Sequence, residues 1–311
     1  MSHSERFHRQ LERVRVRAML AAERACDSPD DEVLLRLDGR LVALERELAE
    51  PTEDDRGLLL AWRLGLEDFE LDLVWTVVAA SIDPLLVSHL GALGGRDALR
   101  GATLSVHAKI WELSGEEART LAIRLVGGHP LFLDHMLAWT GENTIPTRTL
   151  VAAPRTISWL AGDDTLDVAL LGAGSVLAAP EQEAPDTRLY ESLLTTPAPL
   201  VIVDGTMDPV ILPAAARKIG REVIALDLRF LSLDALDAAL IGLRRECRLR
   251  DALPLVLHLE ELESDPRALR VVTSAIARMP GPFAATSRHR ELALAVPRPV
   301  IHLSANPNAR S

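Results

Sequence analysis

The chain has 311 residues, enough for two domains with cores of ordinary size, and 48% of them are hydrophobic. Its formal net charge of −11 argues against a general nucleic-acid surface, which needs clustered positive charge, and favours protein partners. Cys26 and Cys247 form no metal-binding or disulfide pattern, as is typical of a reducing cytoplasm. The polar start and the lack of an apolar run of about 18 residues predict a cytoplasmic protein without a membrane span.

Residues 1–50 have the pattern of two amphipathic helices. Apolar residues recur every three or four positions, most clearly at Leu34, Leu37, Leu41, Leu44 and Leu48. The segment Ser28-Pro-Asp-Asp between the two halves is typical of a loop that caps a following helix. The sequence therefore predicts a helical hairpin over 1–50, with its charges on a solvated face.

Residues 51–163 are denser in apolar side chains and predict a mainly helical domain. Two apolar helices flank Gly65, and further helices are expected over 97–111 and 114–126. A strand-like segment at 148–151 and a short helix at 154–162 complete the region, which indicates a winged-helix-like module. Its five tryptophans are expected in the core: Trp62, Trp75, Trp111, Trp139 and Trp159.

Residues 164–198 contain several prolines and an acidic stretch, and we interpret them as a linker. From 199 to 311, apolar strands alternate with helical patterns, which predicts an α/β domain. The strands are expected at 200–204, 222–227, 255–259, 282–286 and 299–303, with helices at 210–219, 232–250, 266–278 and 288–295. Five buried strands separated by helices indicate a doubly wound, five-stranded parallel sheet, whose ligands bind beyond the carboxyl ends of the strands.

The loop after the first of these strands begins at Gly205, where a phosphate-binding P-loop would begin. Such a loop would need glycine at 210, lysine at 211 and serine or threonine at 212. The chain has Val210, Ile211 and Leu212 instead, and Asp208 adds negative charge where phosphate would lie. These residues therefore form a degenerate nucleotide-binding loop, and ATP binding in the usual way is not expected.

The third predicted strand is followed by two acidic residues, Glu260 and Glu261, in the manner of a Walker B strand. In an active site the first acid would organise magnesium and the second would polarise water. Thr286, at the end of the fourth strand, is placed to contact a γ-phosphate. These three are the candidate catalytic residues. The alternative is that the acids are solvated at a strand end and that the threonine is an ordinary strand residue.

Two regions carry a resemblance to a known family. One is 58–162, with the run Gly-Leu-Glu-Asp-Phe-Glu-Leu-Asp-Leu-Val at 65–74 and the closing Pro-Arg-Thr-Ile-Ser-Trp-Leu-Ala-Gly at 154–162; the other is 199–303, with its five strands. Together they resemble bacterial AAA+ ATPases with a winged-helix-like amino-terminal domain, a group that includes ATPases accompanying contractile injection systems. The resemblance implies a P-loop-NTPase-like sheet.

The departures from that family are equally informative. The resemblance implies a glycine-rich loop with lysine and threonine, and this loop is degenerate here. It also implies a helical lid after the fifth strand, which is not expected in a chain that ends at Ser311. Arg288, Arg290 and Arg298 lie where the family has an arginine finger, but such a finger serves a neighbour's nucleotide.

These observations favour a catalytically inactive AAA+-like scaffold or adaptor without a cofactor. Its partners would be proteins, for example an AAA+ ATPase or a component of a phage-tail-like assembly, and self-association stays open. The first alternative is an unconventional ATPase that uses ATP and magnesium with Glu260 and Glu261. The second is a winged-helix DNA-binding regulator, although the arginines of 51–163 are diluted by acids. The histidines of that region have no metal-ligand spacing.

Overall fold

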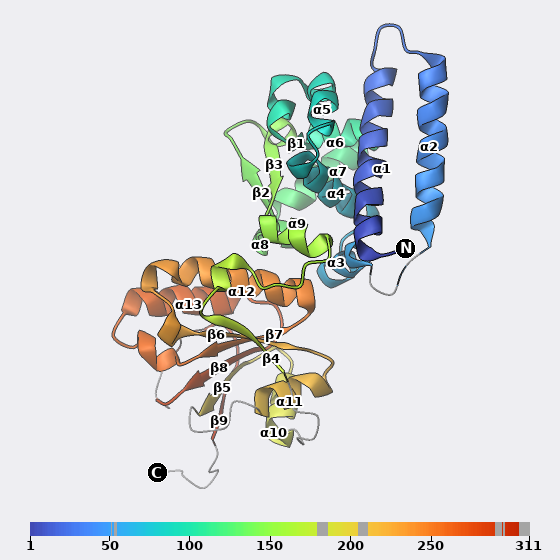
Figure 1. Ribbon diagram of the computed structural model, residues 1–311. Helices are drawn as coiled ribbons and strands as arrows, with labels where there is room; N and C mark the ends of the chain where they lie inside the picture. Colours follow the sequence, from blue (N-terminus) through green and yellow to red (C-terminus); the bar gives the residue numbers. More distant parts are fainter. Residues whose placement is uncertain are drawn as a thin grey trace. The chain divides into compact units, whose positions relative to one another are not determined.

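A computed structural model describes residues 1–50, 52, 55–178, 186–204, 211–289, 294 and 296–304. The chain divides into two compact units, Met1–Asp164 and Thr165–Ser311 (Figure 1). Each unit has its own secondary structure, and each is described by itself below.

The first unit begins with the predicted hairpin of two long helices, α1 (His3–Arg24) and α2 (Asp31–Ala49). A capping box between Ser2 and Glu5 starts α1, and the Asp30 side chain accepts two backbone N–H groups at the start of α2. The hairpin core contains Val16, Leu20, Leu37 and Leu44. The leucine spacing therefore predicted this pair of helices correctly.

The hairpin is part of the first compact unit because α1 packs on the helices that follow it. These are α4 (Asp68–Ile82), α5 (Leu86–Gly94) and α6 (Leu104–Ile110), whereas α2 packs mainly on α1 (Figure 1). A buried ion pair joins Arg6 Nε to Asp55 Oδ2 at 2.5 Å, and the Arg6 guanidinium also donates to the carbonyls of Leu48 and Glu50. One arginine thereby holds the start of α1 to the end of α2 and to the residue that caps α3 (Arg56–Leu64).

The rest of the unit surrounds a small antiparallel sheet with strand order β1-β3-β2. Its remaining elements are η1 (Gly95–Arg100), β1 (Ala102–Thr103), α7 (Gly115–Val126), α8 (Pro130–Leu133), β2 (Leu137–Thr140), η2 (Ile145–Thr147), β3 (Thr149–Ala152) and α9 (Pro154–Leu160). The predicted single helix over 97–111 was wrong. Gly101 has a φ of 147°, which glycine can adopt but which does not occur within a helix. The helical path therefore stops at Gly101, between η1 and β1.

The tryptophans of this unit do not all lie in its core. Trp75 and Trp159 are buried, and Trp111 is half-buried with its indole N–H donated to Thr76 Oγ1 at 2.8 Å. Trp139 is also half-buried and stacks on Phe132, whereas Trp62 is exposed. The prediction of a tryptophan core was therefore wrong for Trp62.

The second unit alternates strands and helices as predicted. Its elements are η3 (Val168–Leu170), β4 (Gly174–Leu177), α10 (Thr187–Leu193), β5 (Leu200–Asp204), α11 (Ile211–Lys218), β6 (Val223–Asp227), η4 (Leu228–Phe230), η5 (Leu233–Ala235), α12 (Leu236–Arg250), β7 (Leu253–Leu257), η6 (Leu259–Leu262), α13 (Pro266–Arg278), β8 (Phe283–Ser287) and β9 (Val300–Leu303). The five predicted strands correspond to β5–β9. The expected helix at 288–295 lies largely outside the described residues.

The sheet of the second unit is mixed and has six strands, in the order β4-β6-β7-β8-β5-β9. Strands β5–β9 are parallel, and β4 pairs antiparallel with β6 at the edge. The prediction of a five-stranded parallel sheet thus omitted β4, which lies in the segment interpreted as a linker. β4 has the sequence Gly-Ser-Val-Leu, with only two apolar side chains larger than glycine, so it lacks the longer apolar run that marked β5–β8.

Two hydrophobic layers cover the faces of this sheet, because successive residues of each strand point to opposite sides. One layer joins Ile202 and Phe283 to α12 and α13 and includes Leu294. The other joins Val201 and Leu255 to α10 and α11. The sheet is therefore covered on both faces, as expected for parallel strands.

Two further features follow from the placement of side chains. Cys26 is exposed in the loop after α1, whereas Cys247 is buried in α12, where desolvation raises the pKa of its thiol. Among the described helices, none is by itself long and apolar enough to cross a membrane; one sharply bent pair, Asp68–Ile82 with Leu86–Arg100, meets the length and composition that a span requires.

Replacing Phe283 by alanine should destabilise the second unit alone. Phe283 is fully buried, so the loss of its ring should cost about 3–5 kcal/mol, whereas Phe230→Ala, at a side chain 67% exposed, should cost less than about 0.5 kcal/mol. All five tryptophans lie in the first unit, so their fluorescence follows that unit while circular dichroism follows both. In urea, Phe283→Ala should shift the dichroism transition and leave the fluorescence midpoint in place. Equal shifts of both signals would contradict the expectation that the two units unfold independently.

Candidate functional site

The candidate site lies at the carboxyl ends of the parallel strands of the second unit. Strands β5 and β8 are neighbours, but the chain leaves them over opposite faces of the sheet. After β5, α11 packs its Leu212 and Ala215 into one hydrophobic layer; after β8, Leu294 and Val296 join the other. Such a change of side is the topological switch point at which doubly wound sheets bind ligands.

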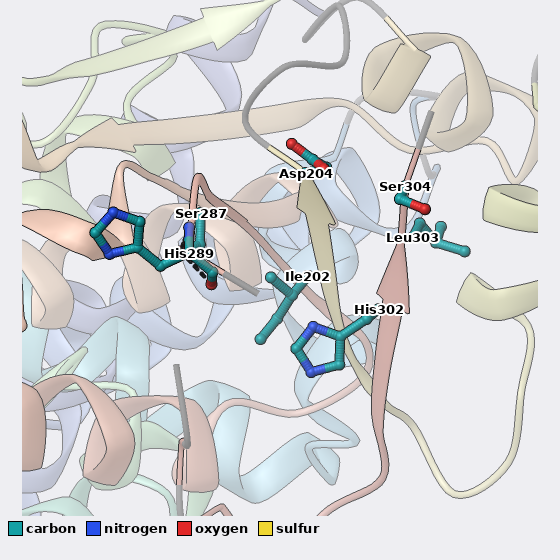
Figure 2. A pocket seen from close by; sticks show the side chains of 7 residues that line it. All are labelled: Ile202, Asp204, Ser287, His289, His302, Leu303 and Ser304. Atoms are coloured by element: carbon teal, nitrogen blue, oxygen red, sulfur yellow. Dashed lines mark hydrogen bonds between the residues drawn. The ribbon is translucent and has the colours of Figure 1, made fainter. Parts of the chain in front are cut away.

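A small pocket occupies this point (Figure 2). It has a volume of about 170 Å³ and is lined by Ile202, Asp204, Ser287, His289, His302, Leu303 and Ser304. Asp204 and Ser287 are register partners at the ends of β5 and β8, and Ser287 Oγ bonds to both the N–H and the carbonyl of His289. The volume is below the roughly 300 Å³ at which small-molecule sites usually begin.

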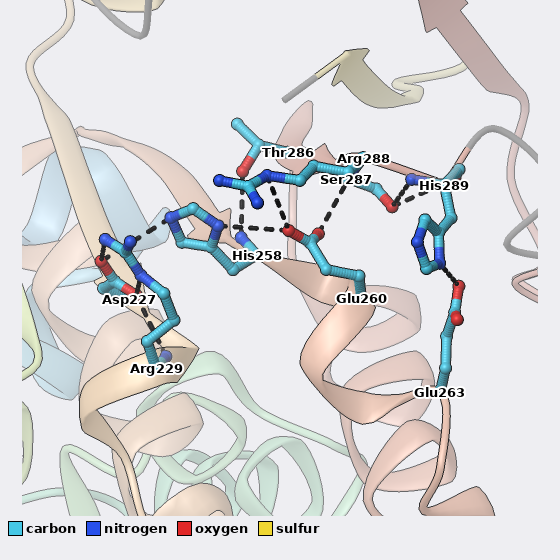
Figure 3. Close-up of polar contacts among 9 residues, drawn as sticks. All are labelled: Asp227, Arg229, His258, Glu260, Glu263, Thr286, Ser287, Arg288 and His289. Carbon is cyan, nitrogen blue, oxygen red and sulfur yellow. Dashed lines mark hydrogen bonds and ion pairs between the residues drawn. The ribbon is translucent and has the colours of Figure 1, made fainter. Parts of the chain in front are cut away.

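Beside the pocket, polar side chains connect the ends of β6, β7 and β8 (Figure 3). His258, just after β7, has its Nδ1 3.3 Å from Glu260 Oε1 and its Nε2 3.9 Å from Asp227 Oδ2 at the end of β6. The backbone N–H of His258 donates to Thr286 Oγ1 of β8 at 3.0 Å. The ends of three adjacent strands are thus joined through one histidine.

His258 has a left-handed backbone, with φ 63° and ψ 53°. This conformation costs a non-glycine residue about 1–2 kcal/mol. It turns the chain from β7 into the short helix η6 and brings Glu260 back over the strand ends. A strained residue at a strand end next to charged side chains is a common feature of functional sites.

The surroundings of Glu260 and Asp227 lower the pKa of both carboxyl groups and so favour their ionised forms. Burial raises the pKa of Glu260, but hydrogen bonds from the backbone N–H groups of Glu260 and Arg288 and from His258 outweigh it and lower the net pKa. Burial likewise opposes ionisation of Asp227, and the side chain and backbone of Arg229 lower its pKa overall. The negative charges of Glu260 and Asp227 are therefore already balanced by groups of the same unit.

The predicted phosphate-binding loop can be followed at two of its positions. Gly205, Asp208 and Val210 lie outside the described residues. Ile211 begins α11 and packs partly buried against the layer under that helix, and Leu212 is completely buried in the same layer. The positions at which a P-loop has its lysine and hydroxyl therefore contribute to the hydrophobic core.

The only two lysines of the chain serve other contacts. Lys109, in the first unit, donates to the carbonyl of Leu93. Lys218 ends α11 and places its ammonium 4.3 Å from the ring centre of Tyr190 in α10. No lysine in the described part of the chain lies at the carboxyl ends of the strands.

The two candidate acids do not follow their strand directly. β7 ends at Leu257, and His258 and the buried Leu259 precede Glu260 and Glu261, which lie on η6. The prediction placed the strand two residues too far along the chain, because it treated the apolar Leu259 as part of the strand. Glu260 joins the group around His258, whereas Glu261 is exposed. Thr286 is buried, and its hydroxyl supports the backbone of His258.

The arginines of this region also differ in role. Arg288 follows β8 and lies 3.8 Å from Glu260, at the edge of the site. Arg298 donates to the carbonyls of Met279 and Gly281 before β8, so it lies at the opposite, amino end of the strands. Arg290 lies outside the described residues. Arg298 is therefore a structural residue of the second unit.

Asp227 and His258 were not singled out from the sequence. Asp227 is the last residue of the apolar strand β6 and His258 directly follows β7, and that position at a strand end was the signal that could have identified them. Their association depends on the strand order and on the left-handed turn at His258, which the sequence pattern does not reveal. Within the residues that the structure describes, no three His, Cys, Asp or Glu side chains are grouped to hold a metal ion.

Comparison of the chain with models of protein families, with curated proteins and with solved structures found no match. The function must therefore be argued from the geometry of the chain itself.

Removing the Thr286 hydroxyl should loosen the turn at His258. Thr286→Val leaves the His258 N–H without its acceptor, which should cost about 1–3 kcal/mol, whereas Thr286→Ser keeps the hydroxyl. Hydrogen exchange of the His258 amide should accelerate in the valine variant and stay close to the parent in the serine variant. An unchanged exchange rate in Thr286→Val would show that this bond does not hold the turn.

Proposed function

We propose that the protein is a catalytically inactive AAA+-like scaffold or adaptor that binds protein partners. The observation that carries the proposal is the burial of Leu212 and the packing of Ile211 at the start of α11. These are the positions that would bind phosphate and magnesium in a P-loop. A side chain committed to the core cannot reach a nucleotide, and neither lysine is available to replace it.

The topology of the second unit supports this relationship. Numbered along the chain, the parallel strands β5–β9 lie in the order 2-3-4-1-5. This order differs from the two common doubly wound orders, 3-2-1-4-5-6 and 2-1-3-4-5, and we take it as compatible with the P-loop-NTPase-like sheet that the resemblance implies. The first strand lies between the fourth and the fifth, and the chain leaves the first and fourth strands over opposite faces of the sheet, so the loop after the first strand is at the switch point. In this proposal, the second unit keeps the sheet of such a fold but not its phosphate-binding chemistry.

The arrangement of the first unit supports a winged-helix-like domain. Helices α6 and α7 lie between β1 and β2 in the chain, and the hairpin of β2 and β3 follows. In DNA-binding proteins of helix-turn-helix type, the second helix enters the major groove. Here that helix would be α7, which has Glu116 and Glu117 in its first turn and exposes Ile123 (68%) and Val126 (61%).

The exposed face of α7 is better suited to a protein than to DNA. Two acids would meet the phosphate backbone unfavourably, and two neighbouring apolar side chains can be buried by another protein. We therefore favour a protein partner, with an AAA+ ATPase or a component of a phage-tail-like assembly as the candidates implied by the resemblance. No observation favours the DNA-binding alternative.

Titration calorimetry with ATP and magnesium tests the loss of nucleotide binding. We expect no binding up to millimolar nucleotide, because the loop offers neither lysine nor hydroxyl to the phosphates. Micromolar binding with turnover would overturn the proposal. In that case Glu261→Gln distinguishes the ATPase alternative, since loss of turnover would assign the catalytic acid to Glu261.

The apolar face of α7 can be tested by copurification with a candidate AAA+ ATPase or tail-sheath protein. Ile123→Glu places a charge in the centre of this face and should reduce capture at least about tenfold. Leu233→Glu, at an exposed leucine of the second unit, is the matched control and should leave capture unchanged. If a partner is captured and both variants bind it alike, α7 is not the binding surface.

A further inference from the structure

The side of α2 that faces away from α1 forms a continuous surface, which we call the outer face of α2. It consists of Glu32, Leu35, Arg36, Gly39, Val42, Ala43 and Arg46, spaced three or four residues apart along one side of the helix. Leu35 is 75% exposed and Val42 is 56% exposed. The solvated face predicted for the hairpin thus contains an apolar stripe.

Gly39 lies in the middle of this face and of the helix. Glycine inside a helix costs about 0.5–1 kcal/mol relative to alanine. A Cβ atom at Gly39 would meet nothing within 4 Å, and the residue has no positive φ. Neither packing nor backbone conformation within the described chain requires glycine here. A second helix that crosses α2 at Gly39 would require glycine, because the missing side chain allows the two backbones to approach closely.

The charges of the hairpin divide into two groups. Those beside the seam between α1 and α2 pair across it, as in Arg9–Glu47, Arg17–Glu45 and Arg40–Glu12. Glu32, Arg36 and Arg46, on the outer face, have no ion pair among the described residues. The outer face therefore keeps charges of both signs available for a partner.

The outer face is complementary to itself about Gly39. Glu32 and Arg46 lie at equal distances along the helix before and after Gly39, as do Leu35 and Ala43, and also Arg36 and Val42. When two such helices cross antiparallel at Gly39, Glu32 of each faces Arg46 of the other. Leu35 of each then meets Ala43 of the other. In a two-fold symmetric contact the same surface of both copies is used, so each residue of the face meets another residue of that same face on the second copy.

We propose that the outer face of α2 binds the outer face of a second copy of this chain, antiparallel and crossing at Gly39. This proposal is independent of the proposed function. A single crossing of two 19-residue helices buries less than a standard interface, so we expect a weak dimer with a dissociation constant of roughly 1–100 μM.

Sedimentation of the full chain between about 1 and 300 μM, a range set by the expected affinity, tests this proposal. The mass should rise from monomer to dimer. Gly39→Glu brings two side chains and two like charges together at the crossing, so this variant should stay monomeric. Glutamate is also a better helix former than glycine, so tryptophan fluorescence should show an unfolding midpoint at or above the parent value. Loss of the dimer then cannot be attributed to loss of the fold.

Charge reversal tests the antiparallel register. Glu32→Arg sets arginine against Arg46 of the second copy, and Arg46→Glu sets two glutamates together, so each should raise the dissociation constant about tenfold. The double variant, Glu32→Arg with Arg46→Glu, again sets an arginine against a glutamate at both places. Its dissociation constant should therefore return to the parent value. Arg119→Glu, the same change on the exposed side of α7, should leave association unchanged.

A parent chain that stays monomeric throughout the concentration range would overturn the proposal. So would a dimer that survives Gly39→Glu, or one in which the double charge reversal fails to recover what the single reversals lose.

Discussion

The burial of Leu212 between α11 and the sheet makes the first turn of α11 part of the hydrophobic core of the second unit. Helix α11 is the first described element after β5, and in a nucleotide-binding fold the segment after that strand would reach phosphate. Because the first turn of α11 presents Ile211 and Leu212 to the hydrophobic layer, this turn stabilises the sheet and offers no charged group to a ligand. A lysine in place of Ile211 would remove apolar contacts as well as add a charge.

The polar groups at the same edge have a corresponding arrangement. His258, Glu260, Asp227 and Thr286 bond to one another or to neighbouring arginines and backbone groups, so they connect strand ends without any ligand. The cost of the left-handed turn at His258 is offset by these bonds. Strand ends that are connected in this way are suited to forming a rigid surface, and this agrees with the role of scaffold that we propose.

The sequence predicted those elements whose side chains share one environment. Strands β5–β8 are buried on both faces, so each appears as an apolar run, and α2 shows its leucines at helical spacing. The missed strand β4 is half-exposed, and the helix expected over 97–111 was broken by the backbone of Gly101. At the site, the residue types alone showed that positions 210–212 do not have the glycine, lysine and hydroxyl of a P-loop. The link between Asp227 and His258 was not evident from the residue types, because it depends on strand order and on one backbone turn.

The two cysteines differ in a way that is useful for experiments. Cys247 is enclosed in α12 with its thiol kept protonated by burial, whereas Cys26 is exposed between α1 and α2. A maleimide reagent applied to the folded chain should therefore attach at the hairpin loop alone. A spin label or fluorophore can be introduced there without changing any residue, and it would report on the end of the hairpin farthest from the Arg6–Asp55 ion pair.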